Sequence, residues 1–330
     1  MILDLLSLEG NKVSSDIKSY STLLYGVPKV GKTEIVSELY GLENTLVLGF
    51  EAGYKNIPGL MGVTIDSYST LLNYLQQLQR KEVRAKYDTI VFDTLDQFAF
   101  ICEKYILDTY GKEALGECKA HGGAYKIFDI KVLNVLKKLN KMNYNIVYLS
   151  HSALKTEKDA TTGQEYDKYL VKAPNRVQSI VLPEVDNIWF AYRKPTGERV
   201  LYTRESMYFQ AGSRIKNLPA EIEFNAETIK RVFKECVVKG MDEKYITTDL
   251  AQQSIGEKEY NFEELMKSIK ELGSELVNRN YHNECNEIIV KELGTNEDGS
   301  TRLLADCTPT QSPVLEVILM KLQELKSSIK

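Results

Sequence analysis

Residues 26–33 follow the pattern G-x-x-x-x-G-K-T and restrict the fold more than any other part of the chain. An apolar run, residues 23–25, precedes this loop, and an apolar helical pattern follows it. A phosphate-binding loop needs this order of strand, loop and helix, because backbone N–H groups of the loop and of the helix N-terminus together surround the phosphates. The pattern therefore predicts an α/β fold that binds a nucleoside triphosphate. The loop residues are Gly26, Val27, Pro28, Lys29, Val30, Gly31, Lys32 and Thr33.

Two further polar positions are expected to bring Mg²⁺ to this loop. In loops of this pattern, Lys32 reaches the β- and γ-phosphates, and the hydroxyl of Thr33 binds Mg²⁺. Another metal-binding residue is expected where a neighbouring strand ends, and Asp93 follows the apolar run 89–92. We predict that Asp93 holds Mg²⁺ opposite Thr33, with a helix cap as the alternative role. For Asp96, capping the next helix and assisting the metal are equal alternatives.

Hydrolysis also needs a group that orients or deprotonates the attacking water. Many ATP motors carry a Glu directly after the strand-ending Asp, but Thr94 occupies that position here. Glu51 follows the apolar run 45–50, and strand ends line the ligand crevice of such sheets. We predict Glu51 as the catalytic carboxylate, with a solvated loop acid as the alternative. Ser150 and His151 end a later strand and are predicted to contact the γ-phosphate; a general base and a structural hydrogen bond are alternative roles for His151.

Strand and helix patterns alternate along the first half of the chain. This alternation predicts a mainly parallel sheet with helices on its faces. Two strand patterns, 186–192 and 199–204, flank a turn and predict a β-hairpin extension. The clearest helical stretches after this hairpin are 226–238, 261–279 and 313–329. We therefore expect an ATP-binding core over residues 1–224 and a mainly helical C-terminal region over residues 225–330.

The composition bears on partners and compartment. The net charge of −4 argues against a strongly basic protein that coats nucleic acid, although a local positive groove is compatible with it. The chain has no run of eighteen apolar residues and no basic segment at its start, so neither a membrane span nor a signal peptide is expected. The five cysteines form no C-x-x-C pair, which favours reduced thiols in a cytoplasmic protein.

Two other classes of P-loop protein leave signatures that this sequence lacks. A GTPase carries Asn-Lys-x-Asp for guanine, whereas the nearest string here, residues 140–143, reads N-K-M-N and precedes a strand. The nucleotide is therefore expected to be ATP. A small-molecule kinase usually has an arginine-rich lid over the phosphates, but Arg176 is the sole arginine within residues 152–180.

In their order, these motifs resemble those of RecA-like P-loop ATPases. The greatest resemblance is to phage-encoded AAA-type ATPases found in recombination or single-strand-annealing gene clusters. The matching stretches are residues 26–33, Glu51, T-I-V-F-D-T-L-D at 89–96, L-S-H at 149–151, A-G-S-R at 211–214 and L-P at 218–219. The resemblance extends over about residues 18–224, and nothing in it accounts for the C-terminal third.

The resemblance implies a RecA-like core that binds ATP and Mg²⁺, hydrolyses ATP slowly and acts on single-stranded DNA in phage recombination or replication. It also implies a homo-oligomer in the host cytoplasm, with other recombination or replication proteins as further partners. A basic residue of such subunits enters the neighbour's ATP site, for which Arg214 is our first candidate before Arg204 and Lys216. A surface salt bridge is the alternative for each.

DNA-binding loops of RecA relatives correspond to residues 112–124 and 152–172 of this chain. In 152–172 four lysines and four acidic residues cancel, so a solvated loop is an equal alternative. Tyr166 and Tyr169 are candidates for stacking on bases. Two other functions remain open: a protein-binding module switched by ATP, and a P-loop phosphotransferase that acts on a small molecule.

Overall fold

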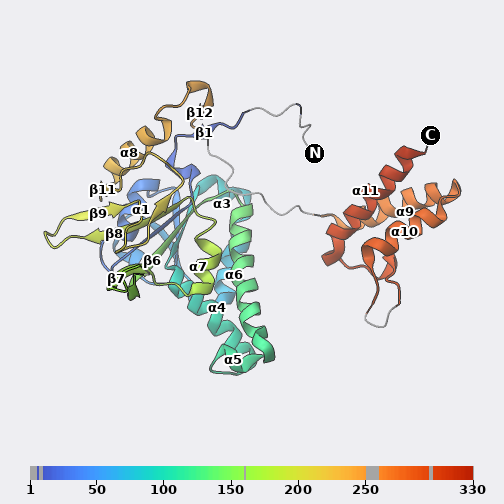
Figure 1. The fold of residues 1–330 in the computed structure, drawn as a ribbon, viewed down its shortest axis with the longest axis horizontal. Coiled ribbons are helices and arrows are strands. Elements are labelled where there is room, and N and C mark those ends of the chain that lie inside the picture. Colours follow the sequence, from blue (N-terminus) through green and yellow to red (C-terminus); the bar gives the residue numbers. More distant parts are fainter. Residues whose placement is uncertain (1–5, 7–9, 160, 250–259, 297–299, 330) are drawn as a thin grey trace. The chain divides into compact units, whose positions relative to one another are not determined.

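The computed structural model describes residue 6 and residues 10–159, 161–249, 260–296 and 300–329. The chain divides into two compact units, Met1–Gly256 and Glu257–Lys330. The first unit holds the sheet and the phosphate-loop motif, and the second is helical. Each unit is described by itself (Figure 1).

A ten-stranded sheet organises the described part of the first unit. Its parallel strands, in spatial order, are β8 (Asn187–Arg193), β2 (Thr22–Gly26), β6 (Asn145–Lys158), β5 (Thr89–Asp93), β3 (Thr45–Gly49) and β4 (Met61–Thr64). The antiparallel strands are β7 (Glu165–Val171), β9 (Arg199–Tyr202), β10 (Gly212–Ser213) and β11 (Glu221–Glu223). The predicted α/β fold with a mainly parallel sheet is confirmed.

Alternation along the strands creates two hydrophobic layers, one on each face of the sheet. Leu23 and Tyr25 belong to one buried cluster, whereas Leu24 between them belongs to the other. The first layer is covered by α2 (Tyr68–Gln77), α4 (Leu95–Tyr110), α6 (Gly123–Lys141) and α7 (Asn175–Val181), and the second by α1 (Lys32–Tyr40) and α8 (Ala226–Val238). Because both faces are covered, the parallel strands read as continuous apolar runs and not as alternating ones.

The first unit also holds α3 (Lys81–Lys86) and α5 (Leu115–Cys118). Residues 67–81, whose leucines recur with a helical period, form α2 and the start of a separate α3. Residues 112–124, expected to form a loop, contain α5 and the start of α6. The predicted hairpin of β8 and β9 is confirmed.

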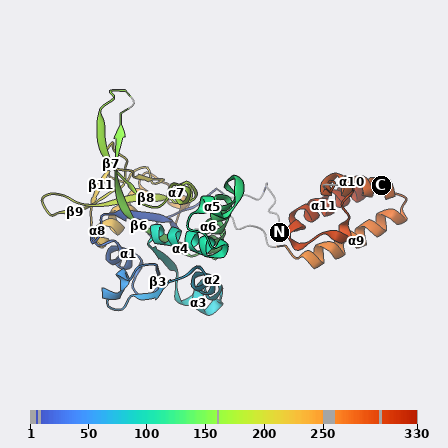
Figure 2. The ribbon, with the colours of Figure 1, turned by 90° about the horizontal axis from the view of Figure 1, so that it is seen from below.

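A second hairpin occupies most of residues 152–172, where the sequence analysis expects a loop. β6 continues past the sheet and pairs antiparallel with β7, with Leu154 opposite Tyr169 and Lys155 opposite Lys168. This β6–β7 hairpin projects away from the sheet (Figure 2). The expectation fails because these residues are mostly polar and show little of the apolar alternation that is the main sign of a strand.

The boundary between the units lies later than residue 224. Helix α8 packs on α1 and belongs to the core, where the ring of Phe233 lies 5.2 Å from that of Tyr20. Beyond α8, β12 (Ile246–Thr247) pairs in parallel with β1 (Val13–Ser14) near the start of the chain. Residues 225–249 therefore complete the first unit, because the apolar face of α8 covers the sheet.

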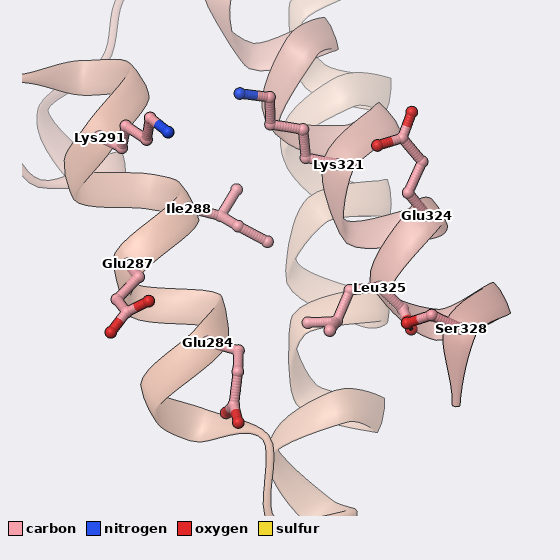
Figure 3. A pocket seen from close by; sticks show the side chains of 8 residues that line it. All are labelled: Glu284, Glu287, Ile288, Lys291, Lys321, Glu324, Leu325 and Ser328. Atoms are coloured by element: carbon pink, nitrogen blue, oxygen red, sulfur yellow. Dashed lines mark hydrogen bonds between the residues drawn. The ribbon is translucent and has the colours of Figure 1, made fainter. Parts of the chain in front are cut away.

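The second unit packs three described helices around a small core. They are α9 (Phe262–Asn278), α10 (His282–Leu293) and α11 (Ser312–Ser328), and α10 is absent from our clearest predicted stretches. A groove of about 490 Å³ lies between α10 and α11. In Figure 3, Ile288 and Leu325 point toward each other across this groove, and charged side chains surround them. Among the described residues of either unit, no helix is long and apolar enough to cross a membrane.

Candidate nucleotide-binding site

The parallel order of the central strands brings the predicted polar residues to one edge of the sheet. Gly26, which ends β2 and begins the loop, lies opposite His151 of β6, and Asp93 at the end of β5 lies opposite Gly49 of β3. Glu51 follows β3 by two residues. Strands that run in the same direction expose their carboxyl ends together, so residues far apart in sequence meet there.

The backbone of the loop depends on its two glycines. Gly31 has a φ of 101°, a left-handed conformation that is strained for residues with a Cβ, and it forms the N-cap of α1. A Cβ at Gly26 would collide with the backbone carbonyl of Ala191 on β8. The pattern thus requires glycine for conformation at one end and for close packing at the other.

Lys32 is buried and turns back over the loop. Its ammonium group donates to the carbonyl oxygens of Gly26 at 3.1 Å and Val27 at 3.2 Å. Burial lowers the pKa of Lys32, and the nearby carboxylates of Asp93, Asp96 and Glu51 oppose this effect. A buried cation whose bonded partners are neutral carbonyls is well suited to a phosphate anion. The residues of this loop therefore fit a nucleotide phosphate.

Thr33 and Asp93 form the pair that the sequence analysis assigns to Mg²⁺. The Thr33 hydroxyl donates to the Asp93 carboxylate at 2.8 Å. Asp93 is buried, which raises its pKa, whereas the hydrogen bond from Thr33 acts in the opposite direction. A hydroxyl oxygen beside a buried carboxylate is a donor set that the hard cation Mg²⁺ prefers. The pair therefore fits Mg²⁺.

Glu51 lies at the same edge of the sheet. Its carboxylate accepts a hydrogen bond of 3.3 Å from Thr94, the residue directly after Asp93. The same oxygen lies 3.8 Å from Nδ1 of His151. Its side chain is 36% exposed, so water reaches it. The structure therefore brings the predicted catalytic carboxylate next to Ser150 and His151, where β6 leaves the sheet, and near the Thr33–Asp93 pair.

Asp96 bonds to β6, which the sequence analysis does not anticipate. Its Oδ2 lies 3.1 Å from Nδ1 of His151, and its Oδ1 accepts bonds from the Ser150 hydroxyl at 3.3 Å and the His151 backbone N–H at 3.4 Å. Burial acts to raise the pKa of Asp96, but the hydrogen bonds and charge of His151 outweigh it and hold the pKa at about 2. Its place one turn after Asp93 is the signal that could have indicated this role.

Arg214 is not part of this cluster. Its backbone follows β10, which pairs with the start of β8, so it lies at the amino end of the strands. Its guanidinium binds the Asp186 carboxylate at 3.0 Å and the carbonyl of Pro183 at 2.9 Å. This ion pair matches the alternative reading of Arg214, and a role in a neighbouring subunit's site stays a prediction.

Arg199 is a loop neighbour that sequence reasoning missed. It starts β9, donates to the carbonyl of Val30 at 3.3 Å and lies over the ring of Phe224 at 5.5 Å. The available signal was the hairpin, because the register places Arg199 opposite Arg193 at the carboxyl end of β8. A basic group thus lies beside the loop in the same chain.

Comparison with known proteins agrees with this geometry. A family model described as AAA domain matches residues 18–215, which include the phosphate loop and every residue of the strand-end cluster. The chain is also 25% identical to the SPbeta prophage-derived uncharacterized protein YorG of Bacillus subtilis (strain 168), over 98% of this chain and 99% of that protein. The family match includes more than half of the chain, and so the chain belongs to the AAA domain family of P-loop NTPases.

Proposed function

We propose that this protein is a Mg²⁺-dependent ATPase in which Glu51 activates the attacking water. The observation that carries the proposal is the contact of Glu51 with Thr94, because it ties a water-accessible carboxylate to the residue next to Asp93. A carboxylate in this position accepts a proton from water as the water attacks.

The remaining residues bind and orient the nucleotide. The loop N–H groups and Lys32 would hold the phosphates, and Thr33 and Asp93 would hold Mg²⁺. The metal neutralises charge that develops on the phosphate oxygens. Ser150 and His151 would contact the γ-phosphate side, with His151 oriented by its bond to Asp96.

The position of residues 140–143 supports ATP over GTP. Asn143 has a positive φ and lies between α6 and β6, at the amino end of β6. The phosphate loop lies at the opposite, carboxyl end of the same strands. The string that most resembles the guanine-recognition motif is therefore remote from the loop as well as incomplete.

The replacement Glu51→Gln tests the catalytic role. We expect ATP binding to be retained and turnover to fall about 100-fold or more, because the amide cannot accept the proton. Phosphate release and fluorescent-ATP titration measure the two quantities. Glu82→Gln, whose side chain is 78% exposed, is the matched control and keeps full activity. Undiminished turnover of Glu51→Gln would assign the catalytic role to another residue.

We further propose that the ATPase acts on single-stranded DNA in phage recombination or replication, as a homo-oligomer. Two observations support this: β6 runs from the site residues Ser150 and His151 into a projecting hairpin, and that hairpin presents the exposed side chain of Lys155. The prophage origin of the relative agrees with a phage context. Turnover and oligomeric state measured with and without single-stranded DNA test it, and the proposal fails if DNA changes neither.

A protein-binding module switched by ATP is the second candidate. The groove between α10 and α11 supports it, since an apolar centre with charged sides is suited to a protein segment. The phosphotransferase reading has less support, because Arg176 binds Asp129 at 2.7 Å and lies over the ring of Tyr125. ATP-dependent turnover that ignores DNA, together with nucleotide-dependent protein binding, would favour the module.

A further inference from the structure

The turn that carries Glu51 continues into a short 3₁₀ helix, η3 (Gly53–Asn56). This helix borders Thr33 and Asp93, the metal pair that is assigned to Mg²⁺. A Cβ built on Gly53 would lie 3.6 Å from Oδ2 of Asp93 and 3.9 Å from Oγ1 of Thr33. The backbone of η3 thus passes close to the atoms assigned to Mg²⁺. A displacement of η3 would move Glu51 relative to these atoms.

Tyr54 is the main side-chain anchor of η3. Within η3, all of whose residues the structure describes, the other three are exposed, whereas Tyr54 packs against the buried cluster beneath α1. Its hydroxyl and that of Thr64, at the end of β4, form a hydrogen bond of 2.7 Å. The N-cap residue of η3, Ala52, makes no side-chain cap hydrogen bond. Backbone N–H groups of Phe50 and Glu51 donate to the Asp93 carbonyl at 2.7 and 3.2 Å and hold the start of the turn, whereas the ring of Tyr54 holds η3 itself.

Two strand glycines make room for this ring. A Cβ at Gly62 of β4 would lie within 3.0 Å of three ring atoms of Tyr54. A Cβ at Gly49 of β3 would meet the same ring and the carbonyl of Glu51. Neither glycine has a positive φ, so conformation does not require glycine there. Glycine weakens a strand unless something must approach its backbone, and here the ring of Tyr54 does so.

We propose that Tyr54 is a positioning residue for hydrolysis, and that Gly62 lacks a side chain in order to admit its ring. The ring fixes η3 against β3 and β4 and thereby holds Glu51 at the metal pair. The inference rests on the proposed role of Glu51, and it assigns Tyr54 no contact with the nucleotide.

A double-mutant cycle of Tyr54→Ala and Gly62→Ala tests the proposal. Each single replacement is expected to lower kcat about tenfold or more while the Kd for ATP changes less than about twofold, because a misplaced catalytic group slows chemistry without removing the phosphate contacts. The double variant should be no slower than Tyr54→Ala, since the added methyl group then meets no ring. Tyr54→Phe keeps the ring and should restore most of the turnover.

The matched control is Gly212→Ala. Gly212 also lies in a strand without a positive φ, but a Cβ there meets no atom within 4 Å, so kcat should not change. Circular dichroism melts establish that the variants are folded, and Tyr54→Leu replaces Tyr54→Ala if the alanine variant does not fold.

Two outcomes overturn the inference. One is a normal kcat in Tyr54→Ala, or in Tyr54→Leu if it is used, while Glu51→Gln is inactive. The other is that Gly62→Ala lowers kcat by the same factor in the wild type and in the Tyr54→Ala variant. Normal turnover in Glu51→Gln instead refutes the catalytic role of Glu51 itself, so the two failures are distinguishable.

Discussion

Charged side chains have different bonding partners at the two ends of the central strands. At the amino ends, opposite charges pair directly: Lys18 binds Asp88 at 2.6 Å, and Arg214 binds Asp186 at 3.0 Å. At the carboxyl ends, Asp96 pairs with His151 at 3.1 Å, but Lys32 binds neutral carbonyls, and the carboxylates of Asp93 and Glu51 accept bonds from hydroxyl groups. One end is thus suited to stability and the other to charged ligands.

Lys32→Ala should produce the largest effect on this contrast. We expect loss of ATP binding and a fall in turnover of about 100-fold or more, because the phosphate charge loses its partner. The free energy of unfolding should change little compared with the loss of ATP binding. The variant gives up two bonds to neutral groups, but it also no longer buries a charge. Nucleotide titration and phosphate release, with Lys104→Ala as the surface control, measure this. Retained binding would contradict the assignment of Lys32 to the phosphates.

The pH dependence of stability tests the contribution of the Asp96 carboxylate at the carboxyl ends of the strands. The pKa of Asp96 is about 2 in the folded protein against 3.8 for the free group, so the carboxylate stabilises the fold above about pH 4 and this contribution is lost as the pH falls toward 2. The shift corresponds to about 2 kcal/mol. Asp96→Asn should therefore flatten the decline of stability across this window, as measured by urea unfolding at each pH.

The control for this prediction is Asp108→Asn. The Asp108 side chain is 63% exposed and pairs with Lys104 on the surface of α4. Its replacement should therefore leave the fall in unfolding free energy at low pH unchanged. If the unfolding free energy of Asp96→Asn falls with decreasing pH as steeply as that of the wild type, the contact between Asp96 and His151 does not stabilise the fold.

Arg214→Ala is expected to have the smallest effect on stability. It tests the ion pair between Arg214 and Asp186 at the amino ends of the strands. The side chain of Arg214 is 62% exposed, so we expect a loss of about 1 kcal/mol or less in unfolding free energy. Arg231→Ala, which removes a helix ion pair whose arginine is equally exposed, is the reference. A fall in turnover that appears only at protein concentrations where subunits associate would assign Arg214 to a neighbour's ATP site.

The strand-end site is the part of the molecule that the sequence predicts best. Asp93, Glu51 and His151 each follow an apolar run, and parallel strands expose such positions at one edge whatever the details of packing. The same rule holds for the phosphate loop, whose spacing is local. The fold class follows from the alternation of strand and helix.

Contacts between distant segments account for what the sequence does not predict. The approach of Arg199 to the loop depends on the register of β9, and the fit of Tyr54 over Gly62 depends on which strand lies beside β3. The β6–β7 hairpin shows little apolar alternation because it projects away from the sheet. Helix α8 belongs to the first unit through its packing on α1, which its own pattern cannot specify.

The short pairing of β1 with β12 has a mechanical consequence for the nucleotide site. Along the described part of the chain, β12 is the last strand before the second unit, which begins at Glu257. A pull exerted through the second unit reaches this pairing before it reaches the ten-stranded sheet. Two residue pairs and a backbone hydrogen bond from Ser15 to the carbonyl of Thr247 join these segments, so we expect the pairing to open at low force. The load then passes to α8 before it reaches β11 of the ten-stranded sheet.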